Sequence, residues 1–300
     1  MANIAESPRI FRGTESSTVL PNLEIKNGQL LIDSSFVAEG ARLGPYDVVM
    51  DFGTSRAGLR GLVPQEQRLS GDSDNLMVLG FKQPLIREAM STLTDLANDP
   101  SRSSENSDDR HAYRTALKRV YQEMAVEVDD WAGNKKALVF APKNGGIFVQ
   151  EVFEEMGFPP SDFLNYRMSR VQKNDSGLIV GTTFGVNNPR ITDYRKFVFA
   201  DDCMASDISA FATMEIIKEA LAKANVPLSE AEVLIAVSAA TQRGLESLLS
   251  QSTKDYFGFG SIKAVAGMPV YKMDSHFYLQ HPDDRYVVGD MGNWTQPPTA

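Results

Sequence analysis

Short apolar runs alternate with amphipathic runs over residues 75–300, and this alternation is the feature that most restricts the fold. Strands that alternate with helices predict βαβ units, because parallel strands need a crossover connection. We therefore expect an α/β fold with a mainly parallel sheet flanked by helices. The sequence predicts strands at 76–81, 136–142, 177–186, 196–200, 232–240 and 262–271, and helices from Pro84 onward and at 110–128, 146–157, 208–225 and 241–252.

The first 74 residues differ from the rest of the chain. They are rich in Gly, Ser and Pro and have no sustained helical period. Asn27-Gly28 lies between two alternating apolar segments, which is typical of a two-residue hairpin. We expect residues 1–74 to be an N-terminal extension or arm and residues 75–300 to be one domain. The arm could be a surface segment, or it could serve in dimerisation or cover a site.

The amino-acid composition limits which binding partners and which cellular location we expect for this protein. The chain has 300 residues, a net charge of −9 and one cysteine, Cys203. The negative charge disfavours nonspecific binding to nucleic acid or to anionic membranes, so we expect neither as a partner. The single cysteine fits a reducing compartment, and there is neither a signal pattern nor an apolar run long enough to span a bilayer. We therefore expect a cytoplasmic protein.

The stretch at 197–211, FVFADDCMASDISAF, carries the most chemistry. Asp201 and Asp202 follow the predicted strand at 196–200, and a loop of mostly small residues leads into a helix. Ligands of parallel sheets bind beyond the carboxyl ends of the strands, and a helix N-terminus binds anions. Two carboxylates beside an anion site suit a phosphorylated sugar. Alternatively, Asp202 or Ser206 caps the helix and the acids are merely exposed.

This stretch resembles the ribose-phosphate loop of type I phosphoribosyltransferases, and most closely that of the uracil phosphoribosyltransferases. Their loop reads roughly DPMLATGGS, where this chain has DDCMASDIS at 201–209. Other segments similar to the family's motifs occur in the family's order: QPLIREAMSTLTD at 83–95, PKNGG at 142–146, NYRMS at 165–169, AATQRGLESLL at 239–249 and YVVGDMGNW at 286–294. The resemblance covers residues 75–300.

The resemblance implies transfer of ribose 5-phosphate from phosphoribosyl pyrophosphate to a nitrogen of uracil or a related base, with release of pyrophosphate. It implies that Asp201 and Asp202 hold the ribose hydroxyls, and that Lys143 and Arg167 meet the pyrophosphate. The implied substrate-binding residues are Asn144 and Gly145 at the pyrophosphate, Cys203 and Met204 directly after the acid pair, Ala205, Ser206, Asp207, Ile208 and Ser209 at the 5-phosphate, and Val287, Val288, Gly289, Asp290, Met291 and Gly292 at the base.

The family also implies a cofactor and an assembly. Mg²⁺ would be bound to the pyrophosphate group of the substrate, and we expect no metal bound directly by protein ligands. Asp290 could face the pyrophosphate or its metal. Homodimers or larger homo-oligomers are usual in the family.

This chain departs from the family's pattern at several positions. Asp207-Ile208 replaces Gly-Gly in the phosphate loop, Lys143 replaces an arginine, and Asn293-Trp294 replaces Asp-Arg at the base segment. Three hypotheses follow: a phosphoribosyltransferase, a non-catalytic regulator that binds a nucleotide or sugar phosphate, or an enzyme whose sugar donor carries a free 5-hydroxyl.

Overall fold

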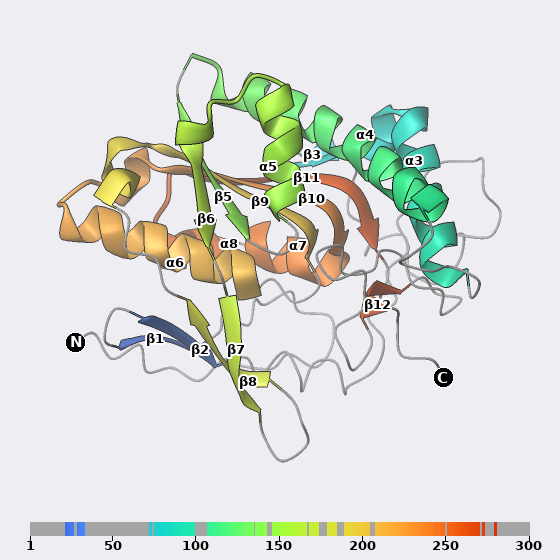
Figure 1. The fold of residues 1–300 in the computed structure, drawn as a ribbon. Helices are drawn as coiled ribbons and strands as arrows, with labels where there is room; N and C mark the ends of the chain where they lie inside the picture. The colour runs from blue at the N-terminus through green and yellow to red at the C-terminus, as the bar shows by residue number, and fades with distance from the viewer. Residues whose placement is uncertain are drawn as a thin grey trace.

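The computed structural model describes residues 22–26, 29–33, 72–73, 75–99, 107–134, 136–142, 146–166, 168–173, 179–184, 189–204, 208–249, 251–270, 272–273 and 279–280. Its centre is a seven-stranded sheet between two layers of helices (Figure 1). The expected α/β class with a mainly parallel sheet flanked by helices is confirmed. The boundary at residue 74 stays a prediction.

The central sheet is parallel except at one edge. Its order is β3-β4-β11-β10-β9-β5-β6, and only β3 runs antiparallel to its neighbour. β9 therefore lies inside the sheet between β10 and β5, where both its faces are covered. The strands are β3 (Asp72–Ser73), β4 (Leu76–Val78), β5 (Ala137–Pro142), β6 (Phe163–Tyr166), β9 (Lys196–Met204), β10 (Glu232–Thr241) and β11 (Ser261–Val270).

Each face of this sheet is covered by its own helices and its own apolar cluster. Phe197 and Phe199 of β9 belong to the α6–α8 cluster, whereas Val198 and Ala200 belong to the α3–α5 cluster. This alternation is the period of two that a strand buried on both faces requires. The helices on one side are α2 (Leu79–Lys82), α3 (Pro84–Asn98), α4 (Ser107–Ala132) and α5 (Gly146–Glu155), and on the other α6 (Ile208–Lys223), α7 (Gln242–Leu249) and α8 (Gln251–Phe257).

A second, antiparallel sheet is built from distant parts of the chain. Its order is β1-β2-β8-β7. The β1–β2 pair confirms the predicted hairpin, with Lys26 opposite Gln29. The run at 177–186, which the strand–helix pattern assigned to the parallel sheet, instead pairs antiparallel with β2 and β7. The strands are β1 (Asn22–Lys26), β2 (Gln29–Asp33), β7 (Met168–Lys173) and β8 (Ile179–Phe184); a separate pair is formed by β12 (Lys272–Met273) and β13 (Leu279–Gln280).

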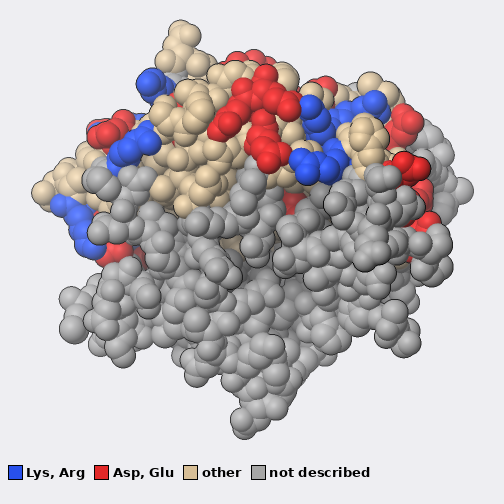
Figure 2. Space-filling view, viewed as in Figure 1, with Lys and Arg blue, Asp and Glu red and all other residues tan. Residues whose placement is uncertain are grey.

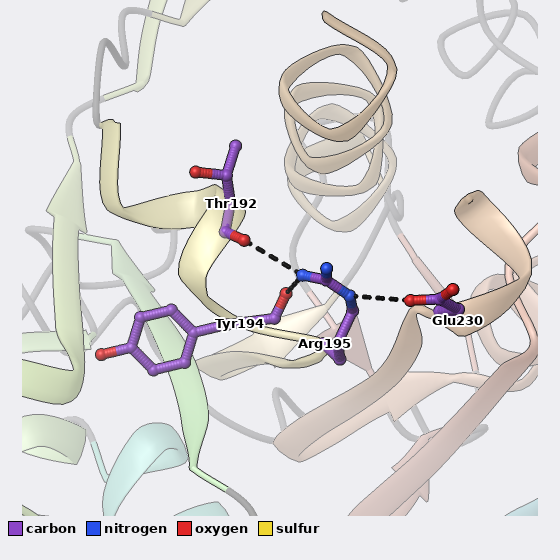
Figure 3. A network of polar contacts seen from close by, with 4 residues as sticks. All are labelled: Thr192, Tyr194, Arg195 and Glu230. Carbon is purple, nitrogen blue, oxygen red and sulfur yellow. Dashed lines mark hydrogen bonds and ion pairs between the residues drawn. The ribbon is translucent and has the colours of Figure 1, made fainter. Parts of the chain in front are cut away.

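Arg195 ties together the amino ends of β9 and β10 (Figure 3). Its guanidinium donates to the carbonyl oxygens of Thr192 and Tyr194, at 3.0 and 2.9 Å, and to Glu230 at 3.1 Å. The main-chain N–H of Glu232 donates to the carbonyl of Arg195 at 2.8 Å. These contacts join the short 3₁₀ helices η4 (Pro189–Asp193) and η5 (Leu228–Glu230), which precede the two strands; the third is η3 (Pro160–Asp162).

The surface of the described part carries charges of both signs. Figure 2 shows basic and acidic side chains interspersed on the face that includes α4 and α5. Arg114 pairs with Glu151, and Lys118 with Glu155, between these two helices. Among the described helices, none has the length and apolar character to cross a bilayer.

Candidate functional site

Asp201 and Asp202 lie within β9, near its carboxyl end. The expectation that the strand stops at Ala200 is wrong, because β9 continues to Met204. Pairing with β10 extends the strand, since Asp201 lies opposite Val237. Both acids are buried, with 9% and 5% of their surfaces exposed. The alternative of exposed acids is therefore excluded.

Each carboxylate of the acid pair accepts a main-chain hydrogen bond. Asp201 Oδ1 accepts from the N–H of Asp202 at 2.9 Å, and Asp202 Oδ1 accepts from the N–H of Cys203 at 2.8 Å. Main-chain donors stabilise the ionised form of a buried carboxylate. These two bonds hold the acid pair at the strand end, and a carboxylate can accept further bonds through its remaining lone pairs.

The alternation of side chains shifts by one residue at the acid pair. Residues three positions apart in a regular strand point to opposite faces. Ala200 and Cys203 nevertheless both pack on the α3–α5 cluster, and in β10 so do Ala236 and Ala239. Because both strands shift at the same level, their register is kept, with Cys203 opposite Ala239. The shift on β10 falls at Ser238.

Ser238 and Gly267 lie at this level on the next two strands. The hydroxyl of Ser238, which is fully buried, donates to the main-chain carbonyl of Asp202. A Cβ on Gly267 would lie 2.5 Å from the carbonyl oxygen of Ser238 and 2.8 Å from Cγ1 of Val120. Only glycine allows this close approach of backbone and helix. Neither residue is among the site residues that the sequence predicts.

Tyr121 on α4 lies near the acid pair on the α3–α5 side. Its side chain is fully buried, and its hydroxyl has no hydrogen-bond partner among the described residues. Burial raises the pKa of Tyr121 well above its ordinary 10.0, and the charges of Asp202 and then Asp201 raise it further. Its ring makes a T-shaped contact with the ring of Phe148 on α5, with 5.8 Å between ring centroids.

The helix α6 begins soon after the acid pair. The predicted loop at 203–209 is too long at both ends, because Cys203 and Met204 belong to β9 and α6 starts at Ile208. Ser209 also belongs to α6, where its carbonyl accepts a hydrogen bond from the hydroxyl of Thr213 at 2.9 Å. The strand and the helix are therefore joined by residues 205–207 alone. Ala205, Ser206, Asp207 and the side chain of Ile208 lie outside the described residues.

The predicted pyrophosphate contacts follow neighbouring strands. The register of β5 and β6 ends with Pro142 opposite Tyr166. In the sequence, Lys143 directly follows the first strand and Arg167 directly follows the second. Their roles stay predictions, because these residues lie outside the described part, as do Asn144, Gly145, Val287, Val288, Gly289, Asp290, Met291 and Gly292.

The described part of the chain contains no cluster of side chains that could bind a metal ion by itself. Within it, no group of three or more His, Cys, Asp or Glu side chains could hold a metal ion. His111 is exposed on α4. The two carboxylates of the acid pair are too few to bind Mg²⁺ by themselves. They suit Mg²⁺ only together with waters and substrate oxygens.

No protein-family model matches this sequence, and no curated protein sequence matches it. Solved structures align at low identity. Adenine phosphoribosyltransferase from Leishmania donovani is 11% identical over 77% of this chain and 94% of that chain, with a TM-score of 0.43. The Trypanosoma brucei enzyme, in complex with AMP, pyrophosphate and ribose-5-phosphate, is 11% identical over 66% and 85%, with a TM-score of 0.41. A hypothetical protein from Neisseria gonorrhoeae with bound ppGpp is 15% identical over 52% and 80%, with a TM-score of 0.34. At TM-scores this low, the assignment of a function to this protein depends on its own residues.

Proposed function

We propose that this protein is a phosphoribosyltransferase that moves ribose 5-phosphate from phosphoribosyl pyrophosphate to a ring nitrogen of uracil or a related base. It works in the cytoplasm as a homodimer or larger homo-oligomer. The observation that supports this function best is the buried acid pair, Asp201 and Asp202, at the carboxyl end of an inner parallel strand. Two adjacent buried carboxylates are costly in free energy, and binding the hydroxyls of a ligand is a use that offsets this cost.

The reaction needs two bonds to change at C1 of the sugar. The bond from C1 to the pyrophosphate oxygen breaks, a bond from C1 to the base nitrogen forms, and pyrophosphate leaves together with the proton that this nitrogen carried. Positive charge builds on the sugar ring as the first bond breaks. The acid pair binds the ribose hydroxyls and so fixes C1 in line with the incoming base. Its negative charge also favours the cationic ring.

The other predicted residues surround the acid pair in the proposed complex. Main-chain N–H groups at 205–209, at the start of α6, hold the 5-phosphate. Lys143 and Arg167 neutralise the pyrophosphate, and the segment at 287–292 reads the base. Mg²⁺, when bound to the pyrophosphate, supplies further charge neutralisation. Because the ion arrives on the substrate, the site needs no cluster of protein ligands.

Release of pyrophosphate tests the proposal. The full chain is incubated with phosphoribosyl pyrophosphate, Mg²⁺ and, in turn, uracil and other pyrimidine and purine bases. We expect base-dependent release of pyrophosphate with at least one base. Absence of release with every base, together with no calorimetric binding of ribose 5-phosphate, would rule the function out.

A second candidate depends on the sequence Asp207-Ile208, where the family has two glycines. A carboxylate at this position repels a phosphate, but it could accept a hydrogen bond from a free 5-hydroxyl. Such a chain would use a sugar donor without the 5-phosphate. A third candidate, the non-catalytic regulator, would bind nucleotides or sugar phosphates without turnover. Calorimetry with ribose 5-phosphate, nucleosides and nucleotides separates these outcomes, since only the second candidate binds nucleosides more tightly than nucleotides.

A further inference from the structure

A groove of about 280 Å³ lies where the end of α4 meets the amino ends of the central strands. Leu234 and Lys263 line it, and they lie opposite one another as the third residues of β10 and β11. The acid pair lies nearer the carboxyl end of this parallel sheet, with Asp201 opposite Val237. Among the described residues, none of the predicted site residues lines the groove, so it is a separate feature of the molecule.

Lys263 is an unusual residue for an inner strand. Its neighbours Ile262 and Ala264 pack in the α6–α8 cluster, so the side chain of Lys263 faces the α3–α5 side. Such positions in a parallel sheet are normally apolar, because helices cover both faces. Lys263 is half-buried, and it makes no hydrogen bond or ion pair with the described residues. Its ammonium is therefore available to an anionic group in the groove.

Lys196 of β9 lies on the same side of the sheet but has partners. Its ammonium donates to the main-chain carbonyl oxygens of Trp131 and Ala132, at the end of α4, and lies 4.0 Å from a carboxylate oxygen of Glu232. It also lies over the ring of Trp131, 4.6 Å from the ring centroid. These contacts give Lys196 a structural role, whereas no contact in the described part of the chain gives one to Lys263.

Glu127 and Asp130 of α4 bring the opposite charge to the same groove. Lys263 forms an ion pair with neither acid. Asp130 is exposed, and Glu127, which has other interactions, can accept further hydrogen bonds through its remaining lone pairs. A ligand with one charge is attracted by one wall of the groove and repelled by the other. A zwitterion suits both walls, since its carboxylate can bind Lys263 and its ammonium can bind the acids.

The size and the apolar lining of the groove restrict the ligand further. Its volume lies at the lower end of the range for small-molecule sites, so it has room for a single amino acid but not for a nucleotide. Apolar side chains from three elements also line it, namely Met77 of β4, Trp131 of α4 and Leu234 of β10. Together they favour a ligand with an apolar side chain of its own.

We propose that this groove binds a free α-amino acid with an apolar side chain. The carboxylate of the ligand binds Lys263, its ammonium binds Glu127 and Asp130, and its side chain packs on the apolar lining. This site does not rest on the proposed function, because the groove lies away from the acid pair and the test below measures binding alone.

The test is calorimetric binding of L-leucine, L-methionine and L-phenylalanine to the full chain. Two analogues with the carbon skeleton of leucine carry one charge each: isocaproate lacks the ammonium, and isoamylamine lacks the carboxylate. We expect at least one amino acid to bind, and each analogue of leucine to bind more weakly than leucine on the order of tenfold, as for loss of a hydrogen bond between charged groups.

Lys263→Met and Asp130→Asn should each weaken binding of the amino acid, also on the order of tenfold. Both variants should fold, since methionine suits an inner strand and Asp130 is exposed. Lys223→Met is the matched control, because this exposed lysine pairs with Glu219 on α6, on the other side of the sheet. It should leave binding unchanged.

Three results would overturn the site. These are no binding of any of the three amino acids at about 10 mM, where a weak small-molecule site is still detected, affinity that Lys263→Met leaves unchanged, or equal binding of leucine and isocaproate. The proposed function fails separately. A chain that binds an amino acid through Lys263 but releases no pyrophosphate with any base would keep this site and lose only that function.

Discussion

The hydroxyl of Ser238 on β10 donates a hydrogen bond to the main-chain carbonyl of Asp202 on β9. The bond falls where both strands shift their side-chain alternation, between the register pairs Asp201–Val237 and Cys203–Ala239. A side chain thus joins the two strands at the level of the acid pair. We infer that Ser238 holds the backbone from which Asp202 projects.

Ser238→Ala should therefore lower both stability and ligand affinity. The variant leaves a buried carbonyl oxygen without this donor, which costs about 1–3 kcal/mol. Urea unfolding measures the stability, and calorimetry with ribose 5-phosphate measures the affinity. Thr94→Val is the control, because it removes a buried hydroxyl that donates to Met90 on α3, outside the site. Equal ligand affinities in the two variants would contradict a positioning role for Ser238.

Gly267→Ala should destabilise the fold by crowding β10. The new Cβ would lie 2.5 Å from the carbonyl oxygen of Ser238, which is backbone and cannot rotate away. Overpacking of this kind costs about 1–3 kcal/mol or more. Adding Val120→Ala relieves only the 2.8 Å contact with the helix, so the double variant should stay less stable than Val120→Ala alone. If the double variant and Val120→Ala have the same free energy of unfolding in urea, the strain in Gly267→Ala comes from the contact with the helix and not from Ser238.

Much of this fold follows from local sequence. Alternation of apolar strands with amphipathic helices predicted the central parallel sheet, because strands buried on both faces read as continuous apolar runs. Pro84 begins α3, as a proline in the first turn allows. Gly157, just past α5, has a φ of +100°, a conformation that favours glycine.

Non-local pairing explains what the sequence did not reveal. Aspartate is disfavoured in strands, so the apolar pattern of β9 ended at Ala200. Pairing with β10 nevertheless carries β9 through both acids to Met204. Helical spacing correctly placed Tyr121 on the apolar stripe of α4, where its side chain is fully buried. Ser238 had no local signal at all, since its partner lies on another strand.

Asp201→Asn should abolish most turnover and leave the fold intact. The asparagine can still accept the hydrogen bond from the N–H of Asp202 through its side-chain oxygen. It loses the negative charge that favours the cationic sugar, so we expect pyrophosphate release to fall on the order of 100-fold. Asp162→Asn is a matched control, a buried acid that accepts from the hydroxyl of Tyr194. Unchanged turnover in Asp201→Asn would remove this carboxylate from the mechanism.

Glu215 should make stability depend on pH. This acid of α6 is 7% exposed, and its Oε2 has no hydrogen-bond partner among the described residues. Burial raises the pKa of its carboxyl above the ordinary 4.5, and Glu219 adds to the rise, whereas Lys218 and the hydroxyl of Tyr256 lower this pKa by a smaller amount.

The folded state therefore binds the Glu215 proton more tightly than the unfolded state. The stability that this proton contributes is fully present below pH 4.5 and is lost as pH rises through the raised, folded-state pKa. Glu215→Gln imitates the protonated acid, so its free energy of unfolding should match the wild type at acid pH and exceed it near neutrality. Urea unfolding across this pH range measures the difference, and Glu88→Gln, an exposed acid on α3, controls for loss of one charge. If the difference between Glu215→Gln and the wild type does not change with pH, burial does not raise the pKa of Glu215, and the carboxylate is ionised in the folded protein at no cost in stability.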